Sequence, residues 1–158
     1  RYDCLLPALC HFNAYKYLCI YLHIKHFITI YMPRLKPEFE ICSYGLYTAW
    51  DRESKLLPKI IKHTLEIEAE PGVEFGFILS VKKAKGEVLE YRIDHPPFTD
   101  EQGNIAPPFE GTYYISSNDF RFFLGDTVWE PVEDKKGIWK LSVYYKGKEV
   151  AGKQFILV

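Results

Sequence analysis

Polar and apolar residues alternate with a period of two through most of residues 38–158, and this pattern constrains the fold more than any other feature. The clearest row runs from Val73 to Val81 and includes Phe75, Phe77 and Leu79 at the alternate positions between them. A strand places successive side chains on opposite faces, so such a row would face a core. The pattern therefore predicts an all-β domain.

Other segments alternate in the same way. A first strand opens at Glu38–Cys42 and runs toward Tyr47, and Leu89–Asp94 forms another. Leu65–Glu70 alternates apolar residues with glutamates, which predicts a half-buried strand with an acidic outer face. The nearest approach to a helical pattern is Ser54–His63, but a proline in its middle would break a helix there.

Short turn signals separate these segments. A glycine stands beside a turn-forming or charged residue at Pro71-Gly72, Lys85-Gly86, Gly103-Asn104 and Lys146-Gly147. Tight turns join antiparallel neighbours, whereas parallel strands need a long crossover connection that is usually a helix. About seven or eight short strands without crossover helices predict an antiparallel β-sandwich.

The end of the chain favours one kind of sandwich. Asp134 and Gly137 precede Trp139, which opens an alternating strand, and Lys146-Gly147 then turns the chain into a last strand. Immunoglobulin-like sandwiches often enter their penultimate strand with an acidic turn, a glycine and a large aromatic residue that fills the core. A generic hairpin explains the pattern equally well. We expect an immunoglobulin-like fold, and under either interpretation we expect Trp139 to be buried.

Residues 1–31 differ in composition from the rest of the chain. They hold three of the four cysteines, three of the five histidines, one acidic residue and no glycine. A metal or disulfide site would use Cys4, Cys10 and Cys19, which are separated by five and eight residues. Structural zinc sites place cysteine pairs about two to four residues apart, so the spacing does not fit.

Two other interpretations of residues 1–31 remain. In one, Leu18–Tyr31 is a signal peptide or a membrane anchor, but it contains Lys25, its uninterrupted apolar run is far shorter than the roughly 18 residues of a span, and no small-residue cleavage site precedes Met32. We favour the other interpretation, in which translation starts at Met32, the only methionine. Residues 1–31 would then be a non-core N-terminal extension outside the natural coding sequence. Residues 32–158 would form the domain, and the protein would stay in the cytoplasm.

The charge balance argues against nucleic-acid binding. The chain has a formal net charge of −1, and residues 32–158 hold twenty of its twenty-one acidic residues, whereas nucleic-acid binding usually shows as a basic face. This part contains one cysteine, Cys42, whose position within a strand favours a small buried side chain. It has no glycine-rich phosphate loop and no metal-spaced set of histidine and glutamate, so we expect no cofactor and no metal.

The longest segment without a strand pattern is His95–Gly111, and loops of this length are often functional. It carries two similar boxes, His95-Pro96-Pro97-Phe98 and Ala106-Pro107-Pro108-Phe109, in which two prolines stiffen the backbone before one phenylalanine. In one interpretation both phenylalanines staple a long crossover onto the edge of the sandwich. In the other, the boxes form a rigid surface that binds a partner.

Two tryptophans beside charged residues extend this hypothesis. They lie in Trp50-Asp51-Arg52 and Trp129-Glu130-Pro131. Exposed tryptophan beside charge is typical of binding surfaces. The alternative is that both tryptophans lie in the core, and for at least one of them we favour that alternative. The candidate partner-binding residues are therefore His95, Pro96, Pro97, Phe98, Pro107, Pro108, Phe109 and Trp129.

Asp94 and His95 suggest an alternative, because a carboxylate can fix the tautomer of an imidazole that acts as a general base. However, adjacent residues on a strand point to opposite faces, and no serine nucleophile in a strained turn lies nearby. We therefore assign no catalytic residue and keep a small hydrolase or ligand-binding enzyme that uses this pair as the alternative.

Six short segments form a specific set when they are taken together. They are Tyr44–Tyr47, Gly72–Gly76, Asp94–Phe98, Phe123–Asp126, Trp129–Asp134 and Gly137–Trp139. With these segments the chain resembles, over about Phe39–Leu157, a bacterial family known only as domain of unknown function 3859. The resemblance implies a bacterial origin and a single small domain. It implies no activity, cofactor or catalytic residue.

We predict a non-enzymatic module that binds a protein or peptide through the Pro-Pro-Phe loop or the Trp129 edge, and addition of a partner strand to a sheet edge is one possible mode. An enzyme that uses Asp94 and His95, and a structural module within a larger assembly, are the alternatives. A flat exposed apolar patch at the boxes would favour binding. A deep pocket in which His95 has a carboxylate within hydrogen-bond reach would favour the enzyme.

Overall fold

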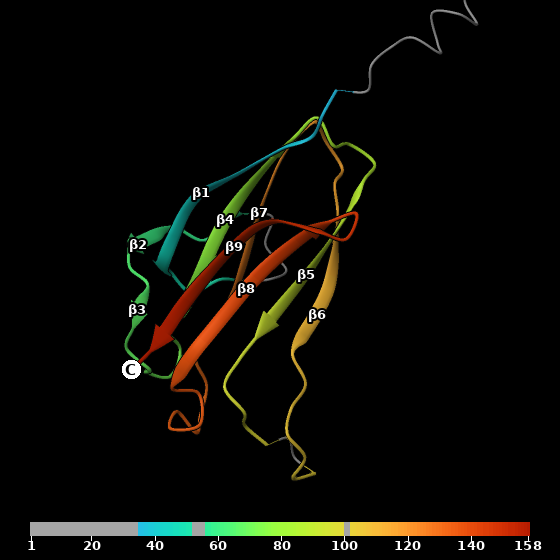
Figure 1. The fold of residues 1–158 in the computed structure, drawn as a ribbon. Coiled ribbons are helices and arrows are strands. Elements are labelled where there is room, and N and C mark those ends of the chain that lie inside the picture. Colours follow the sequence, from blue (N-terminus) through green and yellow to red (C-terminus); the bar gives the residue numbers. More distant parts are fainter. Residues whose placement is uncertain (1–34, 52–55, 100–101) are drawn as a thin grey trace, which may run out of the picture. The chain divides into compact units, whose positions relative to one another are not determined.

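The alternating segments fold into strands, and none of the described residues is helical (Figure 1). The structure, a computed structural model, describes residues 35–51, 56–99 and 102–158, and within them Lys36–Val158 forms one compact unit. The strands are β1 (Glu38–Tyr47), β2 (Ile60–Lys62), β3 (Glu66–Ile67), β4 (Glu74–Lys82), β5 (Val88–Asp94), β6 (Phe109–Tyr114), β7 (Asp119–Thr127), β8 (Gly137–Tyr145) and β9 (Lys148–Leu157). Residues 1–31, with their three cysteines, their apolar segment and the start expected at Met32 just after them, lie outside the described residues.

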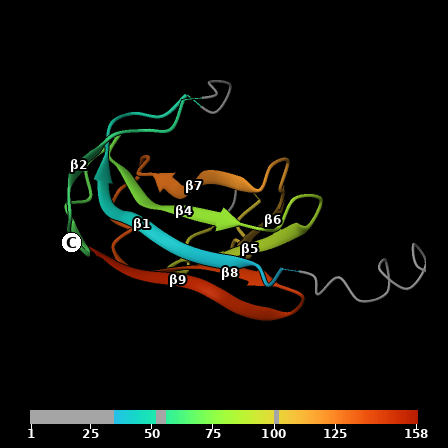
Figure 2. The ribbon, with the colours of Figure 1, turned by 90° about the horizontal axis from the view of Figure 1, so that it is seen from above.

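Two sheets form a sandwich. One sheet has the strand order β2-β1-β4-β7 and the other has the order β3-β9-β8-β5-β6. Neighbouring strands are antiparallel except for β3, which pairs in parallel with the end of β9. Figure 2 shows the sheets as two layers, with β4 and β7 in one and β8 and β9 in the other. The predicted all-β sandwich is confirmed, with nine strands among the described residues instead of seven or eight.

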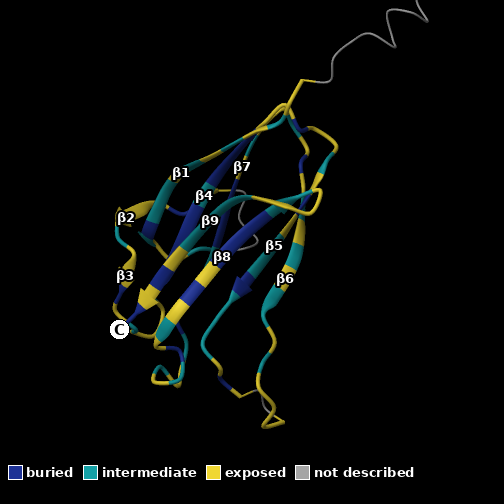
Figure 3. Cartoon of the chain, in the orientation of Figure 1, coloured by how far each residue is buried: buried dark blue, intermediate teal, exposed yellow. Residues whose placement is uncertain are grey.

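The row of apolar residues on β4 lies at the centre of the core, as the alternation predicts. Phe75, Phe77, Leu79 and Val81 are fully buried, and Val73, just before the strand, is half-buried. They share one hydrophobic cluster with side chains from β8 and β9 in the facing sheet. Figure 3 shows the buried positions concentrated along β4 and β8. Each such side chain contributes about 1.5–3 kcal/mol relative to an exposed position.

Trp139 lies in this core, as predicted, with 1% of its surface exposed. Its ring meets the ring of Phe75 edge to face, at a centroid distance of 5.4 Å. Its indole Nε1 donates a hydrogen bond of 2.8 Å to the carbonyl oxygen of Lys135, in the turn that enters β8. A buried indole N–H needs such a partner. The acidic turn and the tryptophan therefore act together, because the turn supplies the acceptor.

The two shortest strands differ from the sequence prediction. The strand expected at Leu65–Glu70 is reduced to β3, since only Glu66 and Ile67 pair with β9. Burial still follows the alternation there, because Ile67 is fully buried and Leu65 is exposed. β2 lies within the segment that had no strand pattern, and all three of its residues are exposed. Pairing with β1 therefore makes β2 a strand although it has no buried face.

Cys42 is exposed, so the buried position expected for it is wrong. The pairing of β1 with β4 shifts register between Ile41 and Ser43, which leaves Cys42 as an extra residue in a β-bulge. A bulge leaves its extra residue without an opposite partner. The exposure of Cys42 continues the alternation of β1, in which Glu38 and Glu40 are exposed while Phe39 and Ile41 are half-buried. A place within a strand therefore did not make Cys42 buried, because the residue belongs to the outer row.

A pair of glycines lets an aromatic ring lie against the outer face of the first sheet. Gly76 on β4 and Gly125 on β7 are directly opposite each other. A Cβ atom would lie 2.9 Å from Cζ of Phe123 if added at Gly76, and 2.3 Å from the same atom if added at Gly125. The ring of Phe123 therefore needs both glycines. It also contacts Tyr47 and Trp50, at centroid distances of 4.8 and 5.3 Å, and this packing places Trp50 beside β7.

Candidate functional site

The segment between β5 and β6 is a hairpin connection. Ile93 pairs with Phe109 at the end of the two strands, and beyond them Thr99 forms a bridge with Ile105. The backbone N–H of Ala106 also donates a hydrogen bond of 2.8 Å to the carbonyl oxygen of Phe98. The crossover expected here is therefore wrong, because β5 and β6 are neighbours in one sheet. We call residues 95–108 the arm.

The two box phenylalanines differ in exposure. Phe98 is 8% exposed and belongs to the hydrophobic core, whereas Phe109 is half-buried. Both rings face Trp129, at centroid distances of 5.5 Å for Phe98 and 6.3 Å for Phe109. Phe98 therefore packs the arm onto the sandwich and presents no surface to a partner. A flat exposed apolar patch, which would have favoured partner binding at the boxes, does not form at Phe98, because its ring turns into the core.

The prolines and His95 complete the arm. Pro97 and Pro107 are exposed, and Pro96 and Pro108 are half-buried. The His95 ring stacks on Phe98 at 4.3 Å. Its two nitrogens each lie 2.9 Å from a carbonyl oxygen, Nδ1 from that of Pro96 and Nε2 from that of Pro107. His95 therefore ties the two boxes together.

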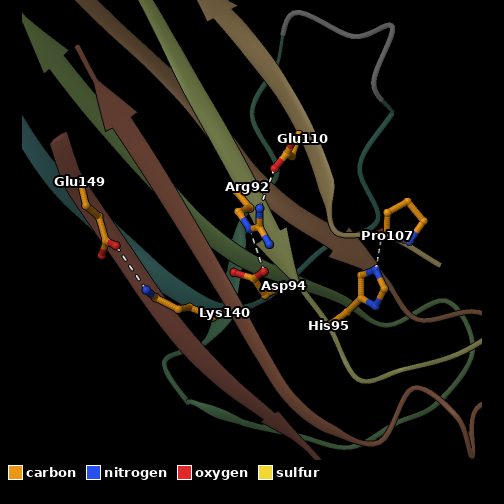
Figure 4. A network of polar contacts seen from close by, with 7 residues as sticks. All are labelled: Arg92, Asp94, His95, Pro107, Glu110, Lys140 and Glu149. Atoms are coloured by element: carbon orange, nitrogen blue, oxygen red, sulfur yellow. Dashed lines mark hydrogen bonds and ion pairs between the residues drawn. The ribbon is translucent and has the colours of Figure 1, made fainter. Parts of the chain in front are cut away.

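Asp94 and His95 do not form an acid/base pair. The Asp94 carboxylate accepts a hydrogen bond of 2.8 Å from Nε of Arg92, and Nη1 of Arg92 donates to Glu110 at 2.8 Å. The hydrogen bond with Asp94 is the main reason that the pKa of Arg92 is raised above its usual value. Figure 4 shows the Asp94 carboxylate directed to Arg92 and the His95 ring directed to Pro107. The alternative site therefore lacks the contact on which its chemistry depends.

Lys135 is a residue that the sequence analysis missed. Its side chain is only 2% exposed, and its ammonium group lies 4.4 Å from the ring centroid of Phe98 and 4.8 Å from that of Trp129. The Nζ atom donates to the carbonyl oxygen of Pro131 at 3.3 Å and forms an ion pair with Asp134. A buried cation needs such partners to offset the loss of hydration. Nothing in a lysine within a charged turn signals this burial.

A cleft of about 430 Å³ lies beside the arm. It is formed where β6 ends one sheet and β7 ends the other, so neither strand has a further neighbour on that side among the described residues. The residues that line it are Trp50, Tyr91, Ile93, Phe109, Thr112, Tyr113, Leu124, Gly125, Asp126 and Trp129. Five of these ten residues are aromatic.

The aromatic walls of the cleft come from segments far apart in the sequence. Phe109 and Trp129 stand next to the arm, and Tyr91 and Tyr113 lie 5.3 Å apart on β5 and β6. The Tyr91 ring lies where β6 has Gly111, since a Cβ atom at that glycine would be 2.5 Å from the phenol oxygen. Only a glycine at this position of β6 leaves room for the ring beside the cleft.

Two hydrogen bonds show which backbone groups of β7 face away from β4, on the side where the described residues supply no neighbouring strand. The Tyr113 hydroxyl donates to the carbonyl oxygen of Phe123 at 3.0 Å, and the backbone N–H of Thr127 donates to Oδ1 of Asp126 at 2.8 Å. Alternate residues of an edge strand direct their backbone groups to the same side. Gly125 lies midway between Phe123 and Thr127, so its N–H and C=O also face the free side, where the cleft lies.

One acidic side chain lines the described part of the cleft. Asp126 is the one charged residue among those that line it, and it follows Phe122 and Leu124 on the inner face of β7. Among the residues that the structure describes, no lysine or arginine lines the cleft. Arg92, the residue after Tyr91, is bonded to Asp94 and Glu110 on the outer face of β5.

The structure separates the predicted site residues into two groups. Phe109 and Trp129 line the cleft, whereas Phe98 and His95 support the arm behind it, together with its four prolines. Trp50, which the sequence marked only as a tryptophan beside charge, also lines the cleft. The sequence did not predict four of the lining residues as site residues, namely Tyr91, Tyr113, Gly125 and Asp126.

The described residues contain neither a group of side chains placed to hold a metal ion nor a helix that could span a membrane. No group of three or more histidine, cysteine, aspartate or glutamate side chains within residues 35–51, 56–99 and 102–158 is placed to hold a metal ion. In the same residues no helix has the length and apolar character needed to cross a bilayer. Cys4, Cys10 and Cys19 lie outside these ranges.

The family model described as "Domain of unknown function (DUF3859)" matches residues 35–157. The chain belongs to this family. The resemblance seen in the six sequence segments is thus confirmed, and the DUF3859 match covers all the described strands. No curated protein matches the chain.

A solved structure shows the same fold as this DUF3859 domain. It is the crystal structure of an immunoglobulin-like protein from Pseudomonas aeruginosa. The two structures have a TM-score of 0.63 and a sequence identity of 23%, over 77% of this chain and 97% of that chain. At this identity the similarity shows the fold alone. The predicted immunoglobulin-like sandwich is confirmed.

Proposed function

We propose that this DUF3859 domain is a non-enzymatic binding module that takes an extended segment of a protein partner into the cleft between β6 and β7. The observation that carries the proposal is the position of the cleft, because five aromatic side chains gather where both sheets end in an edge strand. An edge strand offers backbone groups to an added strand, and the cleft offers a place for one of its side chains.

The backbone of β7 supports strand addition. Gly125 directs its N–H and C=O to the free side of the strand, between Phe123 and Thr127, whose groups on that side already bond to side chains. A partner strand would therefore pair at Gly125 and would meet the rings of the cleft with its alternate side chains.

The composition of the cleft also suits a partner segment. Tryptophan and tyrosine dominate the energetics of protein interfaces because they combine a large apolar face with a polar group. Trp50, Tyr91, Tyr113 and Trp129 are all half-buried, so part of each ring remains available to a partner. The volume of about 430 Å³ lies within the range of roughly 300–1,000 Å³ usual for ligand pockets.

No arrangement of side chains supports the alternative function, an enzyme that uses Asp94 and His95. Asp94 is bonded to Arg92, and both ring nitrogens of His95 face proline carbonyl oxygens. Among the described residues, the cleft is lined by one carboxylate, Asp126, and by no histidine, cysteine or lysine that would serve as base or nucleophile. The bacterial origin and the cytoplasmic location that the sequence suggested stay predictions.

The proposal is tested by selecting phage-displayed random peptides on the full 158-residue chain. Binding of the selected peptides is then mapped by ¹⁵N–¹H NMR. We expect the largest shifts at the amides of Gly125 and Asp126 and at the indole of Trp129. The amides of β2, at the opposite end of the same sheet, should not move.

A matched pair of variants completes the test. Thr112 and Tyr114 are both exposed on β6, but only Thr112 lines the cleft. Thr112→Trp should place a bulky side chain at the rim of the cleft and weaken peptide binding by about tenfold or more, whereas Tyr114→Trp should leave binding unchanged. Peptides that shift signals of β2 or β3, or that bind both variants equally, would overturn the proposal. Failure to select any peptide would do the same.

A further inference from the structure

Residues 59–70, which contain β2 and β3, form the edge of the sandwich that lies away from the cleft, and we call them the edge segment. β2 ends the first sheet and β3 ends the second, whereas β7 and β6 end them on the side of the cleft. Figure 1 shows β2 and β3 on one side of the domain and β6 on the other. We propose that two copies of this chain associate through the edge segment as a symmetric dimer. The proposal does not rest on the proposed function, because the cleft lies at the other edge.

The edge segment exposes a group of aliphatic side chains. Ile60 is 36% exposed, Ile61 is 66% exposed and Leu65 is 43% exposed. Single exposed apolar residues are common on protein surfaces, but a group of them rimmed by charged residues is typical of an interaction site. Each apolar area removed from water contributes about 25 cal/mol per Å². These three side chains would therefore form the centre of the contact.

The charges of the edge segment are separated along the chain. Its first half carries Lys59 and Lys62, and its second half carries Glu66, Glu68 and Glu70, all of them exposed. A two-fold axis through the middle of the segment places the first half of one copy against the second half of the other. Each copy then supplies the charges that the other lacks, and the contact occurs twice. The segment is thus complementary to itself, and this property favours a second copy as its partner.

These five charged side chains have no ion-pair partner within the described part of the chain. Exposed lysines on other strands and turns do have one, since Lys83 pairs with Glu38 and Lys140 pairs with Glu149. The charges of the edge segment therefore remain available for contacts with a second copy. Charge complementarity of this kind also fixes the relative orientation of the two copies.

A hollow of about 290 Å³ on the same edge provides a place for one of these contacts. The three glutamates, Lys62 and Thr64 line it, beside the apolar side chains of Leu46 and Val73. In the two-fold arrangement Lys59 of the second copy lies against this acidic half, so it is the side chain that would enter the hollow. A lysine packs its aliphatic stem on apolar surface and keeps its ammonium group among polar partners.

The contact would be made by side chains and not by strand pairing. Leu65 and Ile67 accept hydrogen bonds from the β9 side, so Glu66 between them directs its backbone groups away from β9. There the Thr64 hydroxyl accepts the N–H of Glu66 at 3.2 Å and donates to its carbonyl oxygen at 2.9 Å, which occupies both groups.

The lysines of the edge segment also decide how the two copies are offset. Antiparallel pairing of β2 with its own copy would bring Lys59 of one chain close to Lys62 of the other, and such like-charge neighbours are destabilising. Lysines on edge strands commonly prevent this pairing. In the arrangement that we propose, β2 of each copy therefore lies against β3 of the other.

The oligomeric state of the full chain tests the proposal. In sedimentation velocity under reducing conditions we expect a monomer–dimer equilibrium whose dimer fraction falls as salt is added, because salt screens exposed charges. Ile61→Asp places a charge in the apolar centre and should weaken association by at least about tenfold. Val88→Asp is the matched control, because Val88 is 49% exposed on β5, outside the edge segment, and it should leave association unchanged. Both substituted side chains are exposed, so circular dichroism should show both variants folded.

Two charge-reversed variants test the two-fold arrangement. Lys59→Glu/Lys62→Glu makes both halves of the edge segment acidic, and Glu68→Lys/Glu70→Lys gives both halves a net positive charge. Each variant alone should stay monomeric at concentrations where the wild type dimerises. An equal mixture of the two should form a heterodimer, because halves of opposite charge again face each other.

The outcomes separate this proposal from the binding of peptides at β7. A wild-type chain that stays monomeric as its concentration approaches about 1 mM would overturn the dimer and leave the proposed function standing. A dimer that survives Ile61→Asp, or a mixture of the charge-reversed variants that stays monomeric, would also overturn it. So would a monomeric chain whose edge segment binds an unrelated protein. Selected peptides should bind the Ile61→Asp monomer as tightly as the wild type, and peptides that bind only the dimer would contradict the separation of the two surfaces.

Discussion

The hydroxyl of Tyr113 on β6 donates a hydrogen bond of 3.0 Å to the backbone carbonyl oxygen of Phe123 on β7, and this bond joins the free edges of the two sheets. The Tyr113 ring also packs on Phe122 at a centroid distance of 4.0 Å. Both contacts lie at the cleft, so they hold its two walls at a defined separation. The cleft therefore depends on a contact between sheets that no local sequence pattern describes.

Tyr113→Phe tests this contact. The change keeps the packing on Phe122 and removes the donor to the Phe123 carbonyl oxygen, so we expect a loss of about 1 kcal/mol in the free energy of unfolding. Urea denaturation followed by fluorescence measures it. Tyr114→Phe is the control, because that side chain is 63% exposed, and it should change stability by less than about 0.5 kcal/mol. Equal stability of the two variants would contradict the role given to Tyr113.

Trp139→Ala should cost about 3–5 kcal/mol, because the ring fills the centre of the core and its removal leaves a cavity. Differential scanning calorimetry should show a large fall in the melting temperature. The neighbouring Ile138 is 56% exposed, so Ile138→Ala should have a small effect. A Trp139→Ala protein that melts within a degree or two of the wild type would show that the core is placed wrongly.

The arm is tested by comparing its two kinds of apolar residue. Phe98→Ala should destabilise the domain by about 3 kcal/mol, since Phe98 packs against Trp129 and beneath Lys135. Ile105→Ala, in the same arm at a side chain that is 70% exposed, should change stability by less than about 0.5 kcal/mol. Equilibrium unfolding in urea distinguishes the two values. Similar losses in both variants would mean that Phe98 does not fasten the arm to the core.

Tyr47 gives the domain a pH dependence in the alkaline range. Burial raises the pKa of its hydroxyl above the usual value of about 10, so the folded protein keeps the proton at pH values where the unfolded chain has released it. This contribution to stability is full below pH of about 10 and is lost as the pH rises through the folded-state pKa. Tyr47→Phe removes the titrating group and its hydrogen bond with Ser43, but keeps the ring contact with Phe123.

The measurement for Tyr47 is the melting temperature of both proteins from neutral to alkaline pH. We expect Tyr47→Phe to be slightly less stable at neutral pH, because the hydrogen bond with Ser43 is lost. Above pH of about 10 the wild type should lose stability more steeply than the variant. Other tyrosines titrate in both proteins and cancel in the comparison. Parallel pH profiles would contradict the assignment to Tyr47.

The local alternation of residues predicted much of the fold. The inward row of β4 needed only the period of two, and the burial of Trp139 needed only its place after an acidic turn. Features that depend on pairing between strands were not predictable in this way. The bulge at Cys42 and the strand β2 both exist because β1 pairs with a particular neighbour in a particular register.

The candidate site was predictable only in part for the same reason. Phe109 and Trp129 stood out because each lies in an unusual local sequence. Tyr113 and Asp126 lie on ordinary alternating strands, and they meet only because β6 and β7 end the two sheets on the same side. Lys135 was hidden for another reason, since a charged residue in a turn is normally solvated and this one is buried between aromatic rings.

The most direct test of the binding account is a crystal structure of the full chain with a selected peptide. We expect the peptide to lie extended along β7, with backbone hydrogen bonds to Gly125 and one side chain among Phe109, Tyr113 and Trp129. A peptide bound along β2 or β3, or on the arm with the cleft left empty, would contradict it.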